Sequence, residues 1–203
     1  MSNQGSDHAI ELQPPENFAM VQSGIYRSAF PRTKNLTHIK SLNLKTVLPL
    51  VPEEYPEALA EFYKANGIKL LSHGLDGNKW PFKELNEDDV SNILKDVFNI
   101  NNQPLLIHCN KGKHRTGSVV GCIRKVQGWA LTAILNEYYM YACPKARLED
   151  QRFIELFDEV KFIKENSALL SSYNGYITGT VTDNHILTDS LSQAHVDPIT
   201  VDP

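Results

Sequence analysis

A polar loop between an apolar run and an amphipathic segment constrains the fold of this chain most strongly. Residues 104–107 form the apolar run, which leads into the basic stretch HCNKGKHRTG at 108–117. Helical periodicity follows over residues 116–127, and Gly128 is placed to end that helix. The predicted unit is a buried strand, a loop and a helix. In an open α/β sheet such a loop lies at the edge where ligands bind.

Strands and helices alternate along most of the chain. Apolar runs predict the strands, and apolar side chains at helical spacing predict the helices. The predicted strands comprise residues 24–28, 46–50, 68–71 and 104–107, and the predicted helices residues 33–42, 55–66, 86–98, 116–127, 131–142 and 148–163. The expected fold class is therefore α/β, with a largely parallel central sheet flanked by helices.

The length and composition fit one globular domain with a tail at each end. The chain has 203 residues, of which 41% are hydrophobic, and this is enough for a substantial core. We expect a polar N-terminal tail over residues 1–13 and a folded domain over 14–166. Residues 167–203 are rich in Ser and Thr and contain no Lys or Arg, which favours a disordered tail.

Composition also excludes several classes of protein. A net charge of −4 argues against general nucleic-acid binding, so any basic site must be a local concentration of cations. No apolar run reaches membrane-spanning length and the polar start is unlike a signal peptide, so we expect a cytosolic or nuclear protein. Three cysteines without CxxC spacing fit neither a disulfide framework nor a zinc site. We therefore expect no metal and no cofactor.

The loop at 108–117 carries the features of an anion site with a nucleophile. Cys109 and Arg115 are separated by five residues, a loop size that can turn its amides inward around a tetrahedral oxyanion. Arg115 can close the ring with a planar fork suited to phosphate oxygens. Gly112 permits a tight turn. The cations and the helix start also stabilise a thiolate, and Thr116 can donate a hydrogen bond to that sulfur when it leaves.

Two other interpretations of this segment are weaker. An isolated cysteine is usually a small buried hydrophobe, and Cys122 and Cys143 are interpreted as such packing residues. Cys109 differs because His precedes it and Arg-Thr closes its loop. A nucleotide-binding P-loop would need GxxxxGK followed by Ser or Thr, whereas His114 follows here and Ile107 stands five residues before Gly112.

The stretch HCNKGKHRTG resembles the HCxxGxxRT signature of cysteine-dependent phosphatases. The wider pattern is similar to the plant-and-fungi atypical dual-specificity phosphatases, whose better-studied members remove a phosphate from inositol pyrophosphates. The similarity covers roughly residues 14–163. It rests on segments 25–31, 77–82, 121–125 and 144–151, which match that family in order.

The resemblance implies the fold of the protein tyrosine phosphatases and a role for each residue of the loop. Cys109 would be the nucleophile that forms a phosphocysteine, which water then hydrolyses. Arg115 would bind the substrate and stabilise charge in the transition state. His108 would orient the loop by hydrogen bonding.

Asp76 is the candidate general acid. It precedes Cys109 by 33 residues and lies in a loop that contains two glycines and a proline, a placement similar to the acid loop of related phosphatases. The alternative is a plain turn residue in Leu75-Asp76-Gly77. A diphosphate leaves more readily than an alcohol, because a phosphate monoester has its second pKa near ~6. A weak or missing acid would therefore favour a diphosphate substrate.

The remaining cations point to a highly charged substrate. One phosphoryl group is satisfied by the loop amides and Arg115, whereas clustered cations concentrate polyanions. Their alternative is a solvated basic turn. For Lys145 and Arg147, solvation or an ion pair is equally compatible with the sequence. The predicted substrate-binding residues are Asn78, Lys79, Asn110, Lys111, Gly112, Lys113 and His114.

Three functions fit these residues. The leading one is hydrolysis of the diphosphate group of inositol pyrophosphates. The second is a protein tyrosine or dual-specificity phosphatase that acts on phosphoproteins by the same chemistry. The third is a pseudophosphatase that binds phosphorylated partners without turnover. The intact Cys109, Arg115 and Thr116 disfavour the third.

Overall fold

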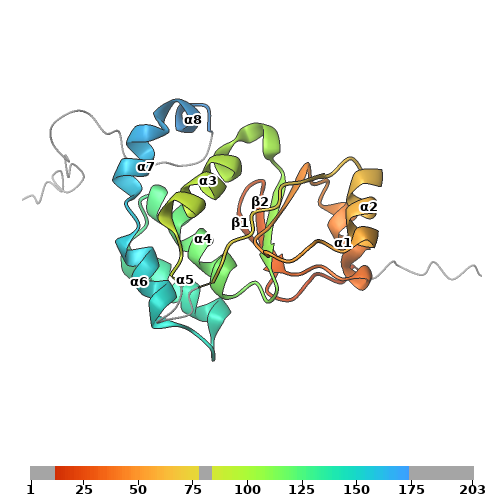
Figure 1. The fold of residues 1–203 in the computed structure, drawn as a ribbon, viewed down its shortest axis with the longest axis horizontal. Coiled ribbons are helices and arrows are strands. Elements are labelled where there is room, and N and C mark those ends of the chain that lie inside the picture. The colour runs from red at the N-terminus through yellow and green to blue at the C-terminus, as the bar shows by residue number, and fades with distance from the viewer. Residues whose placement is uncertain (1–11, 78–83, 174–203) are drawn as a thin grey trace, which may run out of the picture.

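A five-stranded sheet forms the centre of the molecule, with helices on both of its faces (Figure 1). The computed structural model describes residues 12–77 and 84–173. The strands lie in the order β1-β2-β5-β3-β4, and only β1 runs antiparallel to its neighbour. Their bounds are β1 Ala19–Gln22, β2 Ile25–Ala29, β3 Thr46–Pro49, β4 Lys69–Leu70 and β5 Leu105–Cys109. The sheet is mixed and mostly parallel, as predicted.

The helices form two unequal layers. Helices α1 and α2 cover one face of the sheet, and α3 to α8 lie on the other side (Figure 1). Short 3-10 turns precede α1 and β5, at Thr33–Asn35 and Ile100–Asn102. The helices are α1 Leu36–Ser41, α2 Glu57–Ala65, α3 Glu87–Phe98, α4 His114–Val126, α5 Leu131–Ala142, α6 Leu148–Leu156, α7 Glu159–Glu165 and α8 Ser167–Ser171.

The central strand β5 separates two hydrophobic cores. All five of its residues are buried, as expected for a strand covered on both faces. Side chains alternate along a strand, so Leu106 packs with the core under α1 and α2, whereas Leu105 and Ile107 pack with the larger core under α3 and α4. Burial of both faces fixes the register of β5 and therefore the position of Cys109 at its carboxyl end.

The predicted helix ends are largely confirmed. Asn86 caps α3 and accepts hydrogen bonds from the amides of Asp88 and Asp89. Gly67 and Gly128 follow α2 and α4 with φ angles of 68° and 76°, which are typical of glycines that end helices.

The predicted elements differ from the structure mainly in one missed strand and one divided helix. The strand β1 was not predicted; it is four residues long and only one of them is buried, so its hydrophobic pattern is weak. The helix predicted over 148–163 is wrong as a single element. It breaks after Leu156, because the Asp158 side chain accepts a hydrogen bond from the Lys161 amide and caps the new helix α7.

The folded region extends past the predicted boundary at residue 166. Residues Ser167–Ser171 form α8, and Leu170 and Tyr173 are buried in the larger core. The Tyr173 ring packs edge-on against Phe98 of α3, with the ring centroids 5.0 Å apart. These contacts make α8 part of the folded domain. The polar composition of the segment had not indicated this helix. Residues 174–203 and 1–11, where most of the predicted tails fall, lie outside the described ranges.

Candidate active site

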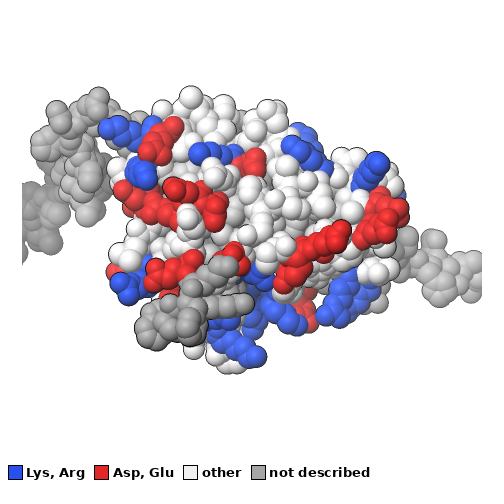
Figure 2. All heavy atoms as spheres, in the orientation of Figure 1, with Lys and Arg blue, Asp and Glu red and all other residues white. Residues whose placement is uncertain are grey.

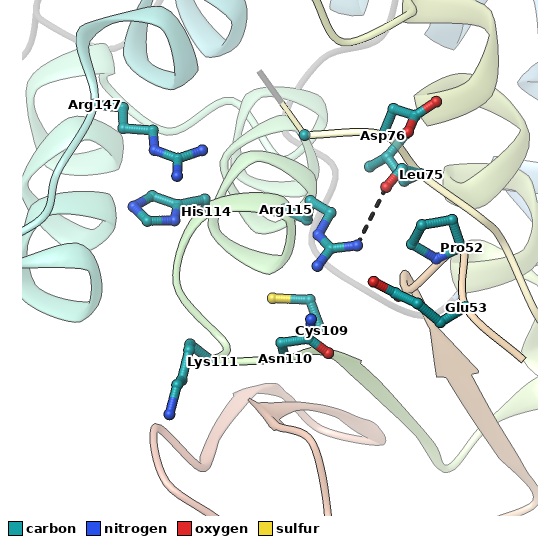
Figure 3. Close-up of a pocket in the computed structure, with 11 residues that line it drawn as sticks. Pro52, Glu53, Leu75, Asp76, Cys109, Asn110, Lys111, His114, Arg115 and Arg147 are labelled. Carbon is teal, nitrogen blue, oxygen red and sulfur yellow. Dashed lines mark hydrogen bonds between the residues drawn. The ribbon is translucent and has the colours of Figure 1, made fainter. Parts of the chain in front are cut away.

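A pocket opens where β5 ends and α4 begins, the position predicted for the functional loop. Cys109 is the last residue of β5, and α4 starts at His114, so Arg115 lies in the first turn of the helix. The cavity measures about 180 Å³. Figure 3 shows the side chains around it. It is lined by Pro52, Glu53, Leu75, Asp76, Gly77, Cys109, Asn110, Lys111, His114, Arg115 and Arg147.

The loop is held against the neighbouring strand β2 at Gly112. This glycine has a φ of 65°, and a Cβ atom there would lie 2.6 Å from the backbone carbon of Ser28. Its carbonyl oxygen accepts a hydrogen bond of 2.9 Å from Nη2 of Arg27. Only a residue without a side chain can make this approach. Gly112 thus shapes the loop by its close packing against β2.

Arg27 supports the loop from β2, a role that spacing alone did not indicate. Its side chain is only 1% exposed, and its guanidinium lies 3.7 Å from the centre of the Tyr141 ring. Burial lowers the pKa of Arg27 to about 10, so the group stays charged at neutral pH. A buried cation beneath the loop both fixes the Gly112 carbonyl and contributes positive potential near Cys109.

Arg115 is oriented by carbonyl groups from two separate loops. Its Nη1 donates to the carbonyl of Leu50 at 3.0 Å and to that of Leu75 at 3.4 Å. Within the described ranges, no residue accepts a hydrogen bond from its Nε or Nη2. The side chain is therefore positioned by one edge while its other donors remain available for an anion.

His108 supports the loop as a neutral side chain. It is fully buried, and burial lowers the pKa of His108 to about 3. Its Nε2 lies 3.1 Å from the Tyr55 hydroxyl, and burial raises the pKa of Tyr55 well above its usual value. Both groups are thus uncharged at neutral pH. This fits the predicted role of His108 in orienting the loop by hydrogen bonding.

Thr116 is completely buried in the first turn of α4. Its hydroxyl has no hydrogen-bond partner among the described residues. A buried hydroxyl without a partner is costly, so such groups usually serve a ligand or a reaction. The hydroxyl therefore has no competing partner among the described residues for the role predicted for it, donation to the Cys109 thiolate.

Two carboxylates line the pocket. Asp76 stands in the wall as predicted, but its carboxylate points away from Cys109 in Figure 3. The Glu53 carboxylate points into the pocket, towards Cys109 and Asn110, in Figure 3. The sequence interpretation missed Glu53. The available signal was its place just after β3, because parallel strands bring their carboxyl ends to one edge of a sheet.

The other predicted substrate ligands divide into those that line the pocket and one that does not. Asn110, Lys111 and His114 line the pocket as predicted, and His114 Nε2 donates to the carbonyl of Lys145 at 2.6 Å. Arg147 lines it as well, from the start of α6. The prediction that Lys113 is a substrate ligand is not supported. Its ammonium group donates to the carbonyl of Cys143 at 3.0 Å, and Lys113 does not line the pocket.

The other predictions about individual residues have mixed outcomes. Cys122 is fully buried in α4, as predicted, but Cys143 is exposed and the prediction that it is a packing residue is wrong. It follows the last residue of α5, where its carbonyl accepts a hydrogen bond from Lys113 and its thiol interacts with the Tyr139 side chain. The predicted ligands Asn78 and Lys79 lie outside the described residues.

Neither a metal centre nor a membrane-crossing helix occurs in the parts of the chain that the structure describes. Within those parts, no group of three or more His, Cys, Asp or Glu side chains could hold a metal ion. No helix there is both long and apolar enough to cross a membrane.

The pocket lining contains Lys111, Arg115 and Arg147, which suit an anionic ligand, beside two carboxylates. Figure 2 shows a group of Lys and Arg side chains along the lower edge of the molecule. A parallel sheet whose central strand ends in Cys109, followed by a loop that closes on Arg115, is the arrangement of the cysteine-dependent phosphatases. A family model described as "Tyrosine phosphatase family" matches residues 12–174. The chain belongs to the tyrosine phosphatase family.

Two similar proteins within this family are inositol diphosphatases. The chain is 55% identical to inositol diphosphatase DSP1 of Oryza sativa subsp. japonica over 72% of this chain and 66% of that protein. It is 51% identical to inositol diphosphatase SIW14 of Saccharomyces cerevisiae over 75% of this chain and 56% of the yeast protein. The chain thus spans two thirds or less of these two relatives.

A solved structure supports the fold. The crystal structure of the core catalytic domain of PP-IP phosphatase SIW14 from S. cerevisiae, in complex with citrate, superposes with a TM-score of 0.73 at 46% identity. The superposition covers 78% of this chain and 95% of that domain. The predicted protein tyrosine phosphatase-like fold is confirmed.

Proposed function

We propose that this protein hydrolyses the diphosphate group of inositol pyrophosphates through a phosphocysteine intermediate on Cys109. The observation that carries the proposal is the pocket itself, in which Cys109 lies beside Arg115 and additional cations. The substrate is supported by the relatives that are 51–55% identical, which are inositol diphosphatases.

The first step is transfer of the terminal phosphoryl group to sulfur. The Cys109 thiolate attacks the terminal phosphorus, the S–P bond forms and the P–O bond to the bridging oxygen breaks. The electron pair leaves with the inositol phosphate. The loop amides and the free edge of Arg115 hold the three non-bridging oxygens, where negative charge is concentrated in the transition state.

The second step returns the enzyme to its starting state. Water attacks the same phosphorus, the S–P bond breaks, and orthophosphate leaves while sulfur regains its electron pair. The buried hydroxyl of Thr116 donates a hydrogen bond to this thiolate. The buried guanidinium of Arg27 adds positive potential from below the loop.

The leaving group decides how much acid catalysis is needed. In Figure 3 the Asp76 carboxylate points away from Cys109, so protonation of the leaving group would require a change of side-chain conformation. A departing phosphate is a much weaker base than a departing alcohol, since the second pKa of a phosphate monoester is about 6. The arrangement therefore favours a diphosphate over a phosphoserine.

A protein phosphatase activity is the second candidate. It is favoured by the match to the tyrosine phosphatase family, because the loop chemistry would be the same. The extra cations argue against it as the main activity. A single phosphorylated side chain has no use for Lys111 and Arg147 in addition to the loop.

Substrate comparison tests the proposal. We expect kcat/KM to be higher for an inositol pyrophosphate than for a phosphotyrosine peptide. Lys111→Ala should lower kcat/KM roughly 10-fold for the inositol pyrophosphate, because it removes a charge-assisted hydrogen bond, and much less for a small aryl phosphate. Cys109→Ser is the inactive control. Equal or better turnover of the peptide by the unmodified protein would contradict the proposal.

A further inference from the structure

A second basic pocket lies beside the catalytic one, on the other side of the loop. Three segments form its walls, namely residues 13–16, residues 29–35 and the loop residues 110–111. Its cavity measures about 200 Å³, close to that of the catalytic pocket. Its polar lining comprises Gln13, Glu16, Arg32, Lys34, Asn35, Asn110 and Lys111.

Hydrogen bonds hold the walls of this second pocket together. Asn35 is only 2% exposed; its side-chain nitrogen donates to the Gln13 carbonyl at 3.0 Å and its side-chain oxygen accepts from the Arg32 amide at 2.9 Å. The Asn17 side chain donates to the Lys111 carbonyl at 2.8 Å. A buried amide thus ties the N-terminal wall to the segment that carries Arg32. The pocket is preformed and does not need a ligand to assemble.

The charges of the second pocket are unbalanced. Arg32, Lys34 and Lys111 are exposed and make no ion pair with any described residue, while Glu16 is the one carboxylate among the lining residues. Three cations and one carboxylate leave two positive charges on a molecule whose net charge is −4. Other cations are paired, as Arg124 is with Glu137. Neighbouring cations without partners attract an anion.

The two pockets are neighbours that share part of the loop as a common wall. Asn110 and Lys111 line both of them, so the second pocket begins where the catalytic one ends. A ligand with several phosphates on a small ring can place one phosphoryl group at Cys109 and another among Arg32 and Lys34. A phosphorylated amino-acid side chain offers only one phosphate and would leave the second pocket unused.

We propose that the pocket lined by Arg32, Lys34 and Lys111 is a subsite for a second phosphate group of the substrate bound at Cys109. The inference rests on the proposed function, because it requires a substrate that carries several phosphates. It assigns substrate selection partly to the segment between β2 and α1, which lies outside the catalytic loop.

Charge-neutralising variants test the subsite. In Arg32→Gln/Lys34→Gln we expect the ratio of KM for an inositol pyrophosphate to KM for a small aryl phosphate to rise about 10-fold, since two charge-assisted contacts are lost. Lys40→Gln/Lys64→Gln removes the same charge from α1 and α2 and should leave the ratio unchanged. Glu16→Gln removes the opposing carboxylate and should lower the ratio.

A binding measurement separates failure of the subsite from failure of the proposed function. Inositol hexakisphosphate, which has no diphosphate, is used as an inhibitor of aryl phosphate hydrolysis. Its inhibition constant should rise about 10-fold in Arg32→Gln/Lys34→Gln. If the protein fails to hydrolyse inositol pyrophosphates but this constant still rises, the subsite stands and the proposed function fails. An unchanged constant and ratio in a variant with unchanged Tm, or an equal change in the Lys40/Lys64 control, would overturn the subsite.

Discussion

At the scale of single residues, the site depends on several buried groups. These groups include Gly112, His108 and Thr116. Gly112 and His108 shape the loop, and Thr116 is the proposed hydrogen-bond donor to the Cys109 sulfur. Their effects are therefore expected to appear in both stability and turnover. The exposed cations are expected to act on substrate binding.

Gly112→Ala should impair the protein far more than the same change at Gly67. The two glycines have similar φ angles, 65° and 68°, so each alanine incurs a similar backbone strain of about 1–2 kcal/mol. At Gly112 the new Cβ also meets the backbone of Ser28, whereas at Gly67 no atom lies within 4 Å. We expect Gly112→Ala to lower kcat by roughly 100-fold or more, as loss of an oxyanion donor does.

Denaturant unfolding and steady-state kinetics on both alanine variants provide the comparison. Gly67→Ala should lose about 1 kcal/mol of stability and keep its kcat. Equal kcat values for the two variants would show that packing against β2 does not shape the loop.

His108 should make the protein less stable as the pH falls. Its pKa is about 3 when folded and about 6.5 when unfolded, so below pH 6.5 the unfolded chain binds a proton that the folded one does not. The stabilisation is complete above pH 6.5 and is lost as the pH falls towards 3. Between pH 7.5 and 5, His108→Gln should lose about 2 kcal/mol less of its free energy of unfolding than the unmodified protein.

Urea titrations at the two pH values measure this difference. Tyr55→Phe serves as the control, because it removes the hydroxyl that contacts His108 without adding or removing a group that titrates in this range. It should keep the pH dependence of the unmodified protein. If His108→Gln kept the same pH dependence of stability, the neutral buried imidazole would not be the source of that dependence.

At the scale of elements, the packing of α4 against α5 and α6 sets the far wall of the pocket. A Cβ atom at Gly117 would lie 2.8 Å from the Tyr138 ring, and one at Gly121 would lie 2.7 Å from Ile154. These two glycines stand one turn apart on α4 and let both neighbouring helices approach closely. The approach carries Arg147, at the start of α6, to the edge of the pocket.

Tyr138→Phe should loosen this packing. The Tyr138 hydroxyl donates to Asp150 at 2.7 Å and accepts from the Arg147 amide at 3.2 Å, and Asp150 is only 1% exposed. Removing a donor from a buried carboxylate costs about 1–3 kcal/mol. Thermal or urea unfolding should show this loss, while Tyr139→Phe, one residue along α5 and 55% exposed, should change stability little. Similar losses in both variants would argue against a specific role for the buried pair.

At the scale of the whole molecule, sequence alone could predict most strongly patterned features that lie close together along the chain. Cys109, Gly112, Arg115 and Thr116 occur within eight residues, and the buried strand before them fixes where they lie. Long amphipathic segments such as α3 were predictable for the same reason, because their pattern is local.

The contacts that the sequence did not predict join segments that lie far apart along the chain. Glu53 and Arg32 reach the loop only because β3 and β2 flank β5 in the sheet. Lys113 turns away because the carbonyl of Cys143, thirty residues further on, accepts its hydrogen bond. Arg27 is buried by the fold, and nothing in its sequence neighbourhood marks it as a support for Gly112.

The most direct test is to trap the phosphorylated enzyme. During turnover of an inositol pyrophosphate, an acid quench followed by mass spectrometry of peptides should reveal one phosphoryl group on Cys109. The species should accumulate further in Thr116→Val, because hydrolysis of the intermediate then lacks its donor to the thiolate, and it should be absent in Cys109→Ser. Turnover by Cys109→Ser at the rate of the unmodified protein, with no phosphorylated cysteine at any time, would contradict the account.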